Sequence, residues 1–474
     1  MSDKMFGDAV PDRLDRLLHE TADNALRFLG GLNDRAAAVV PSPVLTKGPL
    51  PEEGVGLDGA MAQYQAEIEP YLSASAGSRY FGFVTGGVTP AALVGDWLAS
   101  AVDQNPPNPG ESIAPSVTDA TIGQLLDLFD LPREQFDGCF TTGATAANFL
   151  SLIAAREWWA DKLGVDVTGD GMAALPDLKI FSACPHSSMV KVMGLSGVGR
   201  NALVPVDQLP QSEAMDPEAL DKALLESDAS AKIVVASAGT VTATDFDDLN
   251  RIADICASHD AWLHVDGAFG LFARCLPEMA GRVAGIERAD SITADFHKWL
   301  NVPYDCGLFL TRHVEALEKA NAMDVAYLKI EGEAPTYMNR SLENSQRFRA
   351  LPVWMTLQAY GRDGVRDVVR RNCSFAAKLA DWIEQAEGFE LLTPVKLNVV
   401  CFRALFDTDD QDAANKAFLQ TLNEAGSIFC TPGALFGKAG VRAAISNWRT
   451  TEDDLPVTFK ALEEAHAATA QGLK

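Results

Sequence analysis

The sequence predicts an α/β protein with a mainly parallel central sheet. Between Phe140 and Phe309, short apolar runs alternate with amphipathic stretches of helical spacing, as when strands and helices follow one another along the chain. The apolar runs are almost continuous, which is typical of strands covered on both faces. Because 474 residues exceed one typical core, we expect a large domain with smaller parts attached.

The N-terminal part is expected to form an arm. Apolar side chains recur at near-helical spacing from Pro11 to Gly31, and four prolines between Pro41 and Pro51 interrupt the pattern. An arm with little core of its own packs either on its own domain or on a second subunit, and the sequence leaves both arrangements open.

Two helical stretches come next, separated by a proline-rich loop. A helix is expected from Ala91 to Val102, and helical spacing returns from Asp119 to Leu131. Neither a helix nor a strand can continue through the three prolines of residues 104–110.

The central segment supplies the sheet. The expected strands are Leu178 to Ala183, Ile233 to Ser237, Trp262 to Val265 and Ser291 to Ala294, and Leu249 to Ser258 is an amphipathic helix. Ligands bind beyond the carboxyl ends of the strands in sheets of this kind.

The sequence of the C-terminal part predicts a loop followed by a small domain. Residues 327–346 are polar and aperiodic, which indicates a mobile loop of the kind that closes over a site. A long helix follows Leu351, short strands are expected at Asn398 to Arg403, Ser427 to Cys430 and Val441 to Ser446, and Thr451 begins the cap of a final helix. We divide the chain into an arm (1–78), a large domain (79–350) and a small α+β domain (351–474).

Charge and composition exclude several classes of partner. Lys and Arg number 39 against 65 Asp and Glu, a net charge of −26, which argues against nucleic acid or an anionic membrane as a partner.

The first residues lack a basic region followed by an apolar segment, and no stretch is long and apolar enough to span a bilayer. The eight cysteines are scattered, which indicates reduced thiols rather than disulfides or a metal site. We expect a cytoplasmic protein.

The candidate catalytic residue is Lys298, which follows His297 in an apolar setting, Ala294 to Trp299. Partial burial disfavours the ammonium form of a lysine, so its amine becomes a nucleophile that can form a Schiff base with an aldehyde cofactor.

Two further side chains follow expected strands. Asp266 ends the run that begins at Trp262, and an aspartate in pyridoxal phosphate enzymes keeps the ring nitrogen of the cofactor protonated. His186 stands in the loop after Leu178 to Ala183, where an imidazole can stack on a flat aromatic cofactor. Taken alone, each residue more commonly has an ordinary role, Asp266 as a turn or cap acid and His186 as a polar surface group.

A phosphate site is expected where small residues precede a helix. Thr141 to Asn148 contains Gly143, Ala144 and Thr145 and leads into an apolar-rich helical stretch. Open backbone N–H groups and the positive end of the helix dipole favour an anion there.

These four motifs, in this order, resemble the group II pyridoxal-phosphate decarboxylases, the family of aromatic-L-amino-acid, glutamate and histidine decarboxylases. The resemblance runs from about Tyr80 to Trp448. It includes Gly239-Thr240 followed by Phe246-Asp247-Asp248-Leu249, and Arg347-Phe348-Arg349.

The resemblance implies a fold-type I pyridoxal phosphate enzyme, a homodimer with the active site at the subunit interface. Lys298 would carry pyridoxal 5'-phosphate, Asp266 would hold its ring nitrogen, and His186 and Ala268 would cover its two faces. Gly143, Ala144 and Thr145 would bind the phosphate, with Thr240 and His297 beside the cofactor. Tyr337, ten residues before Arg347, matches the loop tyrosine that protonates the substrate carbon, and Arg442 and Tyr80 would contact the substrate, although Arg442 fits a structural ion pair equally well.

Two positions depart from the family. Many members have Asn-Pro before His-Lys, whereas this chain has Asp295-Phe296, so a phosphate contact from an asparagine there is lost. Glu111 lies in a region that forms part of the substrate pocket in relatives.

The implied reaction is decarboxylation of an L-amino acid, of aromatic type, to the amine and carbon dioxide. Acidic and diamino-acid substrates remain open, because relatives use each of them. Aldehyde synthases and aminotransferases share the lysine and the aspartate, so those two residues do not select the reaction. A non-catalytic scaffold protein is the alternative from another class.

Overall fold

The computed structural model describes residues 11–45, 48–107, 112–322 and 337–473. Its large domain is built on a seven-stranded sheet in the order β1-β7-β6-β5-β4-β2-β3. The strands are β1 (Asp137–Thr141), β2 (Leu178–Ser182), β3 (Leu203–Pro205), β4 (Ala231–Ser237), β5 (Trp262–Asp266), β6 (Ser291–Asp295) and β7 (Gly307–Thr311).

The sheet is mainly parallel, as predicted. Strands β3, β2, β4, β5 and β6 pair in parallel, and only β7 runs antiparallel, between β6 and β1. The carboxyl ends of β2, β5 and β6 therefore meet at one edge, together with that of β1. Side chains that follow these four strands are brought together although up to about a third of the chain separates them in sequence.

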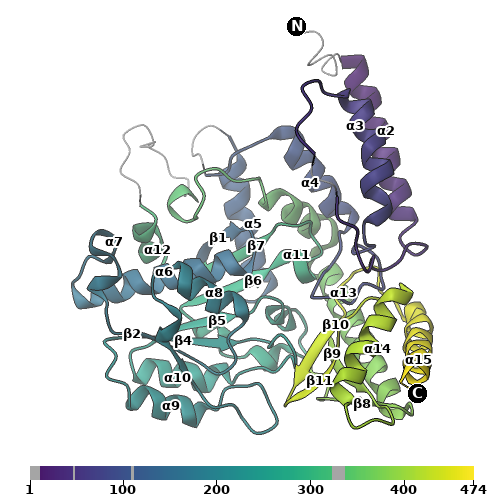
Figure 1. Ribbon diagram of the computed structural model, residues 1–474. Helices are drawn as coiled ribbons and strands as arrows, with labels where there is room; N and C mark the ends of the chain where they lie inside the picture. Colours follow the sequence, from purple (N-terminus) through teal and green to yellow (C-terminus); the bar gives the residue numbers. More distant parts are fainter. Residues whose placement is uncertain (1–10, 46–47, 108–111, 323–336, 474) are drawn as a thin grey trace.

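Helices cover both faces of this sheet (Figure 1). They are α5 (Ala114–Leu128), α6 (Ala144–Leu163), α7 (Val167–Asp170), α8 (Ser187–Leu195), α9 (Pro217–Leu225), α10 (Leu249–Ser258), α11 (Phe296–Trp299) and α12 (Val314–Ala320). Figure 1 shows α6 and α8 on one side of the sheet and α9 and α10 on the other. The strands are apolar because both faces are covered, and Phe181, Trp262 and Phe309 are fully buried.

A long helix, α13 (Ala350–Gln385), joins the large domain to the small one. Its first half packs against α4 (Pro90–Val102) and the large core, which includes Val369, whereas Phe375 belongs to the core of the small domain. The small domain has a four-stranded antiparallel sheet in the order β10-β11-β9-β8. Its elements are β8 (Phe389–Leu391), β9 (Val399–Ala404), α14 (Gln411–Ala425), β10 (Thr431–Leu435), β11 (Lys438–Ala444) and α15 (Leu455–Gly472).

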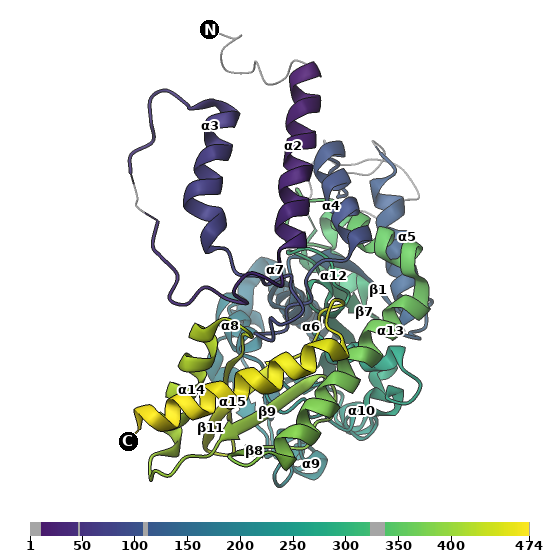
Figure 2. The same cartoon turned by 90° about the vertical axis from the view of Figure 1, so that its right-hand side faces the viewer.

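The N-terminal helices α2 (Pro11–Gly30) and α3 (Gly56–Gln63) project from the rest of the chain side by side, as Figure 2 shows. Leu18 and Leu26 on α2 are 61% and 67% exposed. The arm therefore leaves apolar surface uncovered within one subunit.

One predicted strand is wrong. Ser427 to Cys430 is not a strand, and β10 instead begins at Thr431 and includes Pro432 and Gly433. Proline lacks an N–H to donate, so the sequence argues against a strand there, but β10 lies at the edge of its sheet, where proline is tolerated. Among the helices that the structure describes, none combines the length and the apolar character needed to cross a membrane.

Candidate active site

Three predicted site residues lie at the carboxyl edge of the large sheet. Asp266 is the last residue of β5, Lys298 lies in α11 directly after β6, and His186 is the residue before α8 in the loop after β2. In the parallel register, Asp266 lies opposite Ser237 and Thr293. The charges of Asp266 and Lys298 both influence the pKa of His186, so the three side chains share one electrostatic site.

Asp266 is held by two N–H donors. The backbone N–H of Ala268 donates to Oδ1 at 3.1 Å, and Nδ2 of Asn148 donates to Oδ2 at 3.3 Å. Both donors fix the orientation of the carboxylate. A carboxylate in a fixed orientation is what a protonated pyridine nitrogen requires of its partner.

The amide of Asn148 is itself fixed by a buried network. Its Oδ1 accepts from Thr293 Oγ1 at 2.8 Å and from His264 Nε2 at 3.1 Å. Burial lowers the pKa of His264 to about 4, so the imidazole is neutral at physiological pH. Because Oδ1 is occupied by two donors, Nδ2 must face Asp266 and Ser188. The sequence motif contained Asn148, but nothing in it indicated contact with Asp266.

His186 is neutral and positioned by its neighbours. Burial lowers the pKa of the ring, and Nδ1 lies 2.7 Å from Ser188 Oγ. Since Ser188 Oγ also accepts from Asn148, the histidine and the aspartate are connected through two polar side chains. A neutral, oriented imidazole is suited to stack on an aromatic ring.

Lys298 is partly buried, as its apolar setting predicted. Its side chain is 21% exposed, and Nζ lies 2.9 Å from Oδ2 of Asp295 and 5.8 Å from the centre of the Phe269 ring. Its backbone is covered by another segment, because a Cβ atom on Gly86 would lie 1.7 Å from the carbonyl oxygen of Lys298. The segment around Gly86 therefore packs against the backbone of Lys298.

The N-terminus of α6 has the features of a phosphate cradle. Gly143 has φ of +146°, and a Cβ there would lie 3.0 Å from Cε1 of His297, so only glycine allows this close approach. Because the N-cap residue is a glycine, no side chain of that residue caps the helix, and Thr145 is exposed in the first turn. Ala144 N–H donates to Oδ1 of Asp295 at 2.6 Å. Backbone donors, a helix dipole and an open hydroxyl fit a phosphate group.

His297 and Ala268 line the same edge. His297 Nδ1 accepts from the backbone N–H of Cys306 at 3.2 Å, its ring stacks on Tyr304 at 4.4 Å between centroids, and burial lowers its pKa. The carbonyl of Ala268 accepts from the backbone N–H of Asp295 at 2.8 Å. His297 thus precedes Lys298 in α11, and Ala268 is bonded to Asp295, the residue that contacts Lys298 Nζ. Thr240 differs, because its hydroxyl donates to Glu213 at 2.5 Å.

Arg442 is buried and incompletely paired. Its Nε and Nη1 donate to the carbonyls of Val241 and Phe83, each at 2.5 Å, whereas Nη2 is buried without a hydrogen-bond partner among the described residues. Burial lowers the pKa of Arg442 to about 10, so the side chain remains charged at neutral pH. Its charge also influences the pKa of His186. A desolvated cation with an open donor beside the site is suited to bind a carboxylate.

Three aromatic side chains gather at the segment that this arginine contacts. Tyr80 stacks on Phe429 with 4.8 Å between ring centroids, and Phe83 lies 6.5 Å from the same ring. Phe83 is 62% exposed, and its carbonyl is the one that Arg442 contacts. Burial raises the pKa of Tyr80, as does the nearby Tyr304. The predicted substrate residues Tyr80 and Arg442 are therefore brought to one place.

Tyr337 lies apart from this group. It is buried, its ring lies 5.7 Å from the guanidinium carbon of Arg340, and Asp119 and burial raise the pKa of its hydroxyl. It lines a small cavity with Cys139 and Arg349. Glu111 and residues 327–336 of the predicted loop lie outside the described residues.

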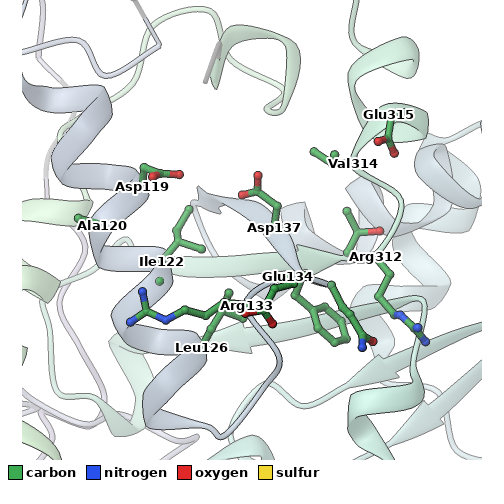
Figure 3. A pocket seen from close by; sticks show the side chains of 14 residues that line it. Asp119, Ala120, Ile122, Leu126, Arg133, Glu134, Asp137, Arg312, Val314 and Glu315 are labelled. Carbon is green, nitrogen blue, oxygen red and sulfur yellow. The ribbon is translucent and has the colours of Figure 1, made fainter. Parts of the chain in front are cut away.

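A cavity of about 450 Å³ lies at the other end of the sheet (Figure 3). It is bounded by α5, by Asp137 at the start of β1 and by Thr311 at the end of β7. Figure 3 shows Asp119 and Asp137 facing its open space. Because β1 runs from this cavity toward Gly143, the cavity is separated from Lys298 by the length of the strand and is not the candidate site.

Comparison with known proteins decides the family. Residues 45–405 match the family model described as the pyridoxal-dependent decarboxylase conserved domain. The chain belongs to this family. The predicted family, the cofactor pyridoxal 5'-phosphate and the class of enzyme, an amino-acid decarboxylase, are thereby confirmed.

The individual relatives include proteins named as decarboxylases and proteins named as aldehyde synthases. Aromatic-L-amino-acid decarboxylase from Bacillus atrophaeus is 29% identical over 402 residues, covering 81% of each chain. Phenylacetaldehyde synthase from Arabidopsis thaliana is 27% identical over 437 residues, covering 87% of each chain. The crystal structure of Oryza sativa TDC with PLP and tryptamine has a TM-score of 0.90 at 22% identity, covering 98% of this chain and 99% of the other. The last comparison shows that the fold is shared.

Proposed function

We propose that this decarboxylase converts an aromatic L-amino acid into its amine and carbon dioxide. The observation that carries the proposal is the buried Nη2 of Arg442, which has no hydrogen-bond partner among the described residues, on a side chain that contacts Phe83 of the aromatic group Tyr80, Phe83 and Phe429. The relative from Bacillus atrophaeus, named for aromatic amino acids, supports the same class of substrate.

Arg442 would hold the carboxylate of the amino acid. Two of its nitrogens are fixed by backbone carbonyls, so the third points in one direction without loss of side-chain entropy on binding. In its buried position, pairing with a carboxylate is stronger than it would be in water. The aromatic side chain would then lie against Phe83, which is exposed on the segment that covers Lys298.

The cofactor residues have separate roles. Bound pyridoxal phosphate supplies a protonated ring that accepts the electron pair left by the departing carbon dioxide. Lys298 is the amine that attaches it, Asp266 keeps the ring nitrogen protonated, and the neutral His186 covers one face. Asn148 orients Asp266, and the segment around Gly86 packs against the backbone of Lys298.

Tyr337 as the proton donor remains a proposal from the sequence match. Its hydroxyl is buried against Asp119, so the tyrosine would have to leave this position to reach substrate bound at Lys298. Residues 323–336, directly before it, lie outside the described part of the chain.

We further propose that the enzyme is a cytoplasmic homodimer with the active site at the subunit interface. The exposed leucines of α2 support a second copy as the partner of the arm. All eight cysteines are unpaired and seven of them are buried, which supports a reducing compartment.

Incubation of the purified protein with a panel of amino acids tests the proposed function. Tryptophan, tyrosine, phenylalanine, dopa, glutamate and diaminobutyrate are compared, and carbon dioxide, amine, aldehyde and peroxide are each measured. Amine and carbon dioxide from the aromatic members in equal amounts support the proposal. Aldehyde with peroxide in place of amine indicates an aldehyde synthase, as in the relative from Arabidopsis thaliana, and turnover of only the acidic or diamino acids refutes the substrate class.

A further inference from the structure

We propose that Asp295 competes with the phosphate of the cofactor for the backbone N–H of Ala144, so that cofactor binding is coupled to the uptake of a proton. The inference rests on pyridoxal phosphate as the cofactor and concerns a residue at which this chain departs from the sequence pattern of the family.

The carboxylate of Asp295 occupies the expected phosphate site at the N-terminus of α6. Its Oδ1 accepts from Ala144 at 2.6 Å, at the start of α6. The carboxylate is held there by its own strand, because Asp295 ends β6 and its N–H donates to Ala268 O at 2.8 Å. Its side chain is only 4% exposed. A phosphate oxygen that accepts the same N–H must displace Oδ1 or lie in contact with it.

Among the described residues, Lys298 is the cation that contacts the carboxylate of Asp295. Nζ of Lys298 lies 2.9 Å from Oδ2. His297 Nε2 is 3.7 Å from the same oxygen, but this ring accepts from Cys306 through Nδ1 and burial lowers its pKa, so it is neutral. Attachment of the cofactor to Nζ leaves at most one hydrogen on that nitrogen, so Asp295 loses hydrogen bonds as a phosphate arrives.

The other titratable groups that face Asp295 do not replace this counter-charge. They are His186 and Cys306; burial lowers the pKa of the histidine and raises that of the thiol, so both are neutral. A carboxylate beside a phosphate in a desolvated site is costly, because like charges repel strongly at low dielectric. Protonation of Asp295 removes the repulsion, and the resulting O–H can donate to a phosphate oxygen. The proton comes from solvent and binds a carboxylate oxygen of Asp295, and this uptake is separate from the water that is lost when the cofactor attaches to Nζ.

Asp295→Asn imitates the protonated form. An asparagine has the same shape, carries no charge and offers an N–H donor. We expect the variant to bind pyridoxal 5'-phosphate about tenfold more tightly than wild type at pH 8. The dissociation constant of wild type divided by that of the variant should rise by up to about tenfold per pH unit, over the pH range in which Asp295 must take up a proton to bind the cofactor. Pyridoxal, which lacks the phosphate, should distinguish the two proteins less than pyridoxal 5'-phosphate does, because the change at Lys298 Nζ then acts on Asp295 without a phosphate charge beside it.

The experiment combines two measurements on cofactor-stripped protein. Dissociation constants for pyridoxal 5'-phosphate and pyridoxal are measured by absorbance between pH 6 and pH 9. Calorimetry in two buffers of different ionisation enthalpy counts the protons taken up. Asp305→Asn is the control, because it removes a negative charge that also acts on His297 but does not contact Ala144; it should behave as wild type.

The expected result is that wild type takes up about one proton more per pyridoxal 5'-phosphate than Asp295→Asn does. Equal proton counts and equal affinities would overturn the proposal, as would weaker binding by a folded Asp295→Asn. If that variant does not fold, the wild-type measurements test the proposal. The affinity of wild type for pyridoxal 5'-phosphate, relative to its affinity for pyridoxal, must then decline as the pH rises. Wild type that binds no pyridoxal phosphate at any pH would instead contradict the cofactor assignment.

Discussion

Replacement of Asn148 by alanine tests whether the buried network orients Asp266. Asn148 makes four side-chain hydrogen bonds, with Asp266, Ser188, Thr293 and His264. The substitution removes all four and leaves Thr293 Oγ1 and His264 Nε2, both buried, without the partner that they have in the wild type. The carboxylate of Asp266 keeps one donor, the N–H of Ala268.

The magnitude follows from the kind of bond. A hydrogen bond to a charged group contributes about 1.5–3 kcal/mol. If that bond orients Asp266 toward the cofactor, its loss weakens cofactor binding by roughly 10- to 150-fold. Each neutral partner left unsatisfied costs a further ~1–3 kcal/mol of folding stability, so the variant is also less stable.

Asn415→Ala separates the two effects. Asn415 is a buried asparagine of the small domain, and it makes three side-chain hydrogen bonds with the backbone of Ala404 and Gln411. Its loss should lower the urea midpoint as Asn148→Ala does, without a change in cofactor affinity. Urea denaturation and absorbance titration with pyridoxal 5'-phosphate measure both quantities. Wild-type cofactor affinity in folded Asn148→Ala would refute the role of the network.

Three further predictions concern single side chains. Arg442→Met should raise KM for the amino acid by about tenfold or more in steady-state assays while the bound cofactor keeps its spectrum, because a charged hydrogen bond to the substrate is lost; an unchanged KM would assign Arg442 a structural role. Tyr337→Phe should lower amine formation and release aldehyde if the tyrosine donates the proton, and wild-type amine formation would leave it the structural role that its burial indicates. His264 is neutral when folded, with a pKa of about 4 against 6.5, so the unfolded chain binds more protons between these values and stability should fall by up to ~3 kcal/mol as the pH drops from 6.5 to 4. Urea midpoints of wild type and His264→Gln across this range measure that loss, and parallel curves would contradict it.

The fold was predictable because local pattern and tertiary environment agree. Strands buried on both faces must be apolar throughout, and the helix expected at Leu249 to Ser258 has those bounds in the structure. The prediction failed at Ser427 to Cys430, because an edge strand tolerates Pro432 and Gly433 where an inner strand would not. No local pattern states whether a strand lies at an edge.

The candidate site was predictable to the extent that its residues follow strands. Lys298, Asp266 and His186 gather because parallel strands present their carboxyl ends together. Asn148 was not identified, since its contact with Asp266 joins residues that are 118 positions apart. The sequence showed Asp295 as a departure, but only the structure shows its bond to Ala144.

The central claim is that Lys298 attaches the cofactor beside Asp266, and borohydride reduction followed by peptide mapping tests it most directly. The reduced protein should carry one pyridoxyl group, on the peptide that contains Lys298, and Lys298→Ala should carry none. A pyridoxyl group on another lysine of the wild-type protein, or none at all, would contradict the account.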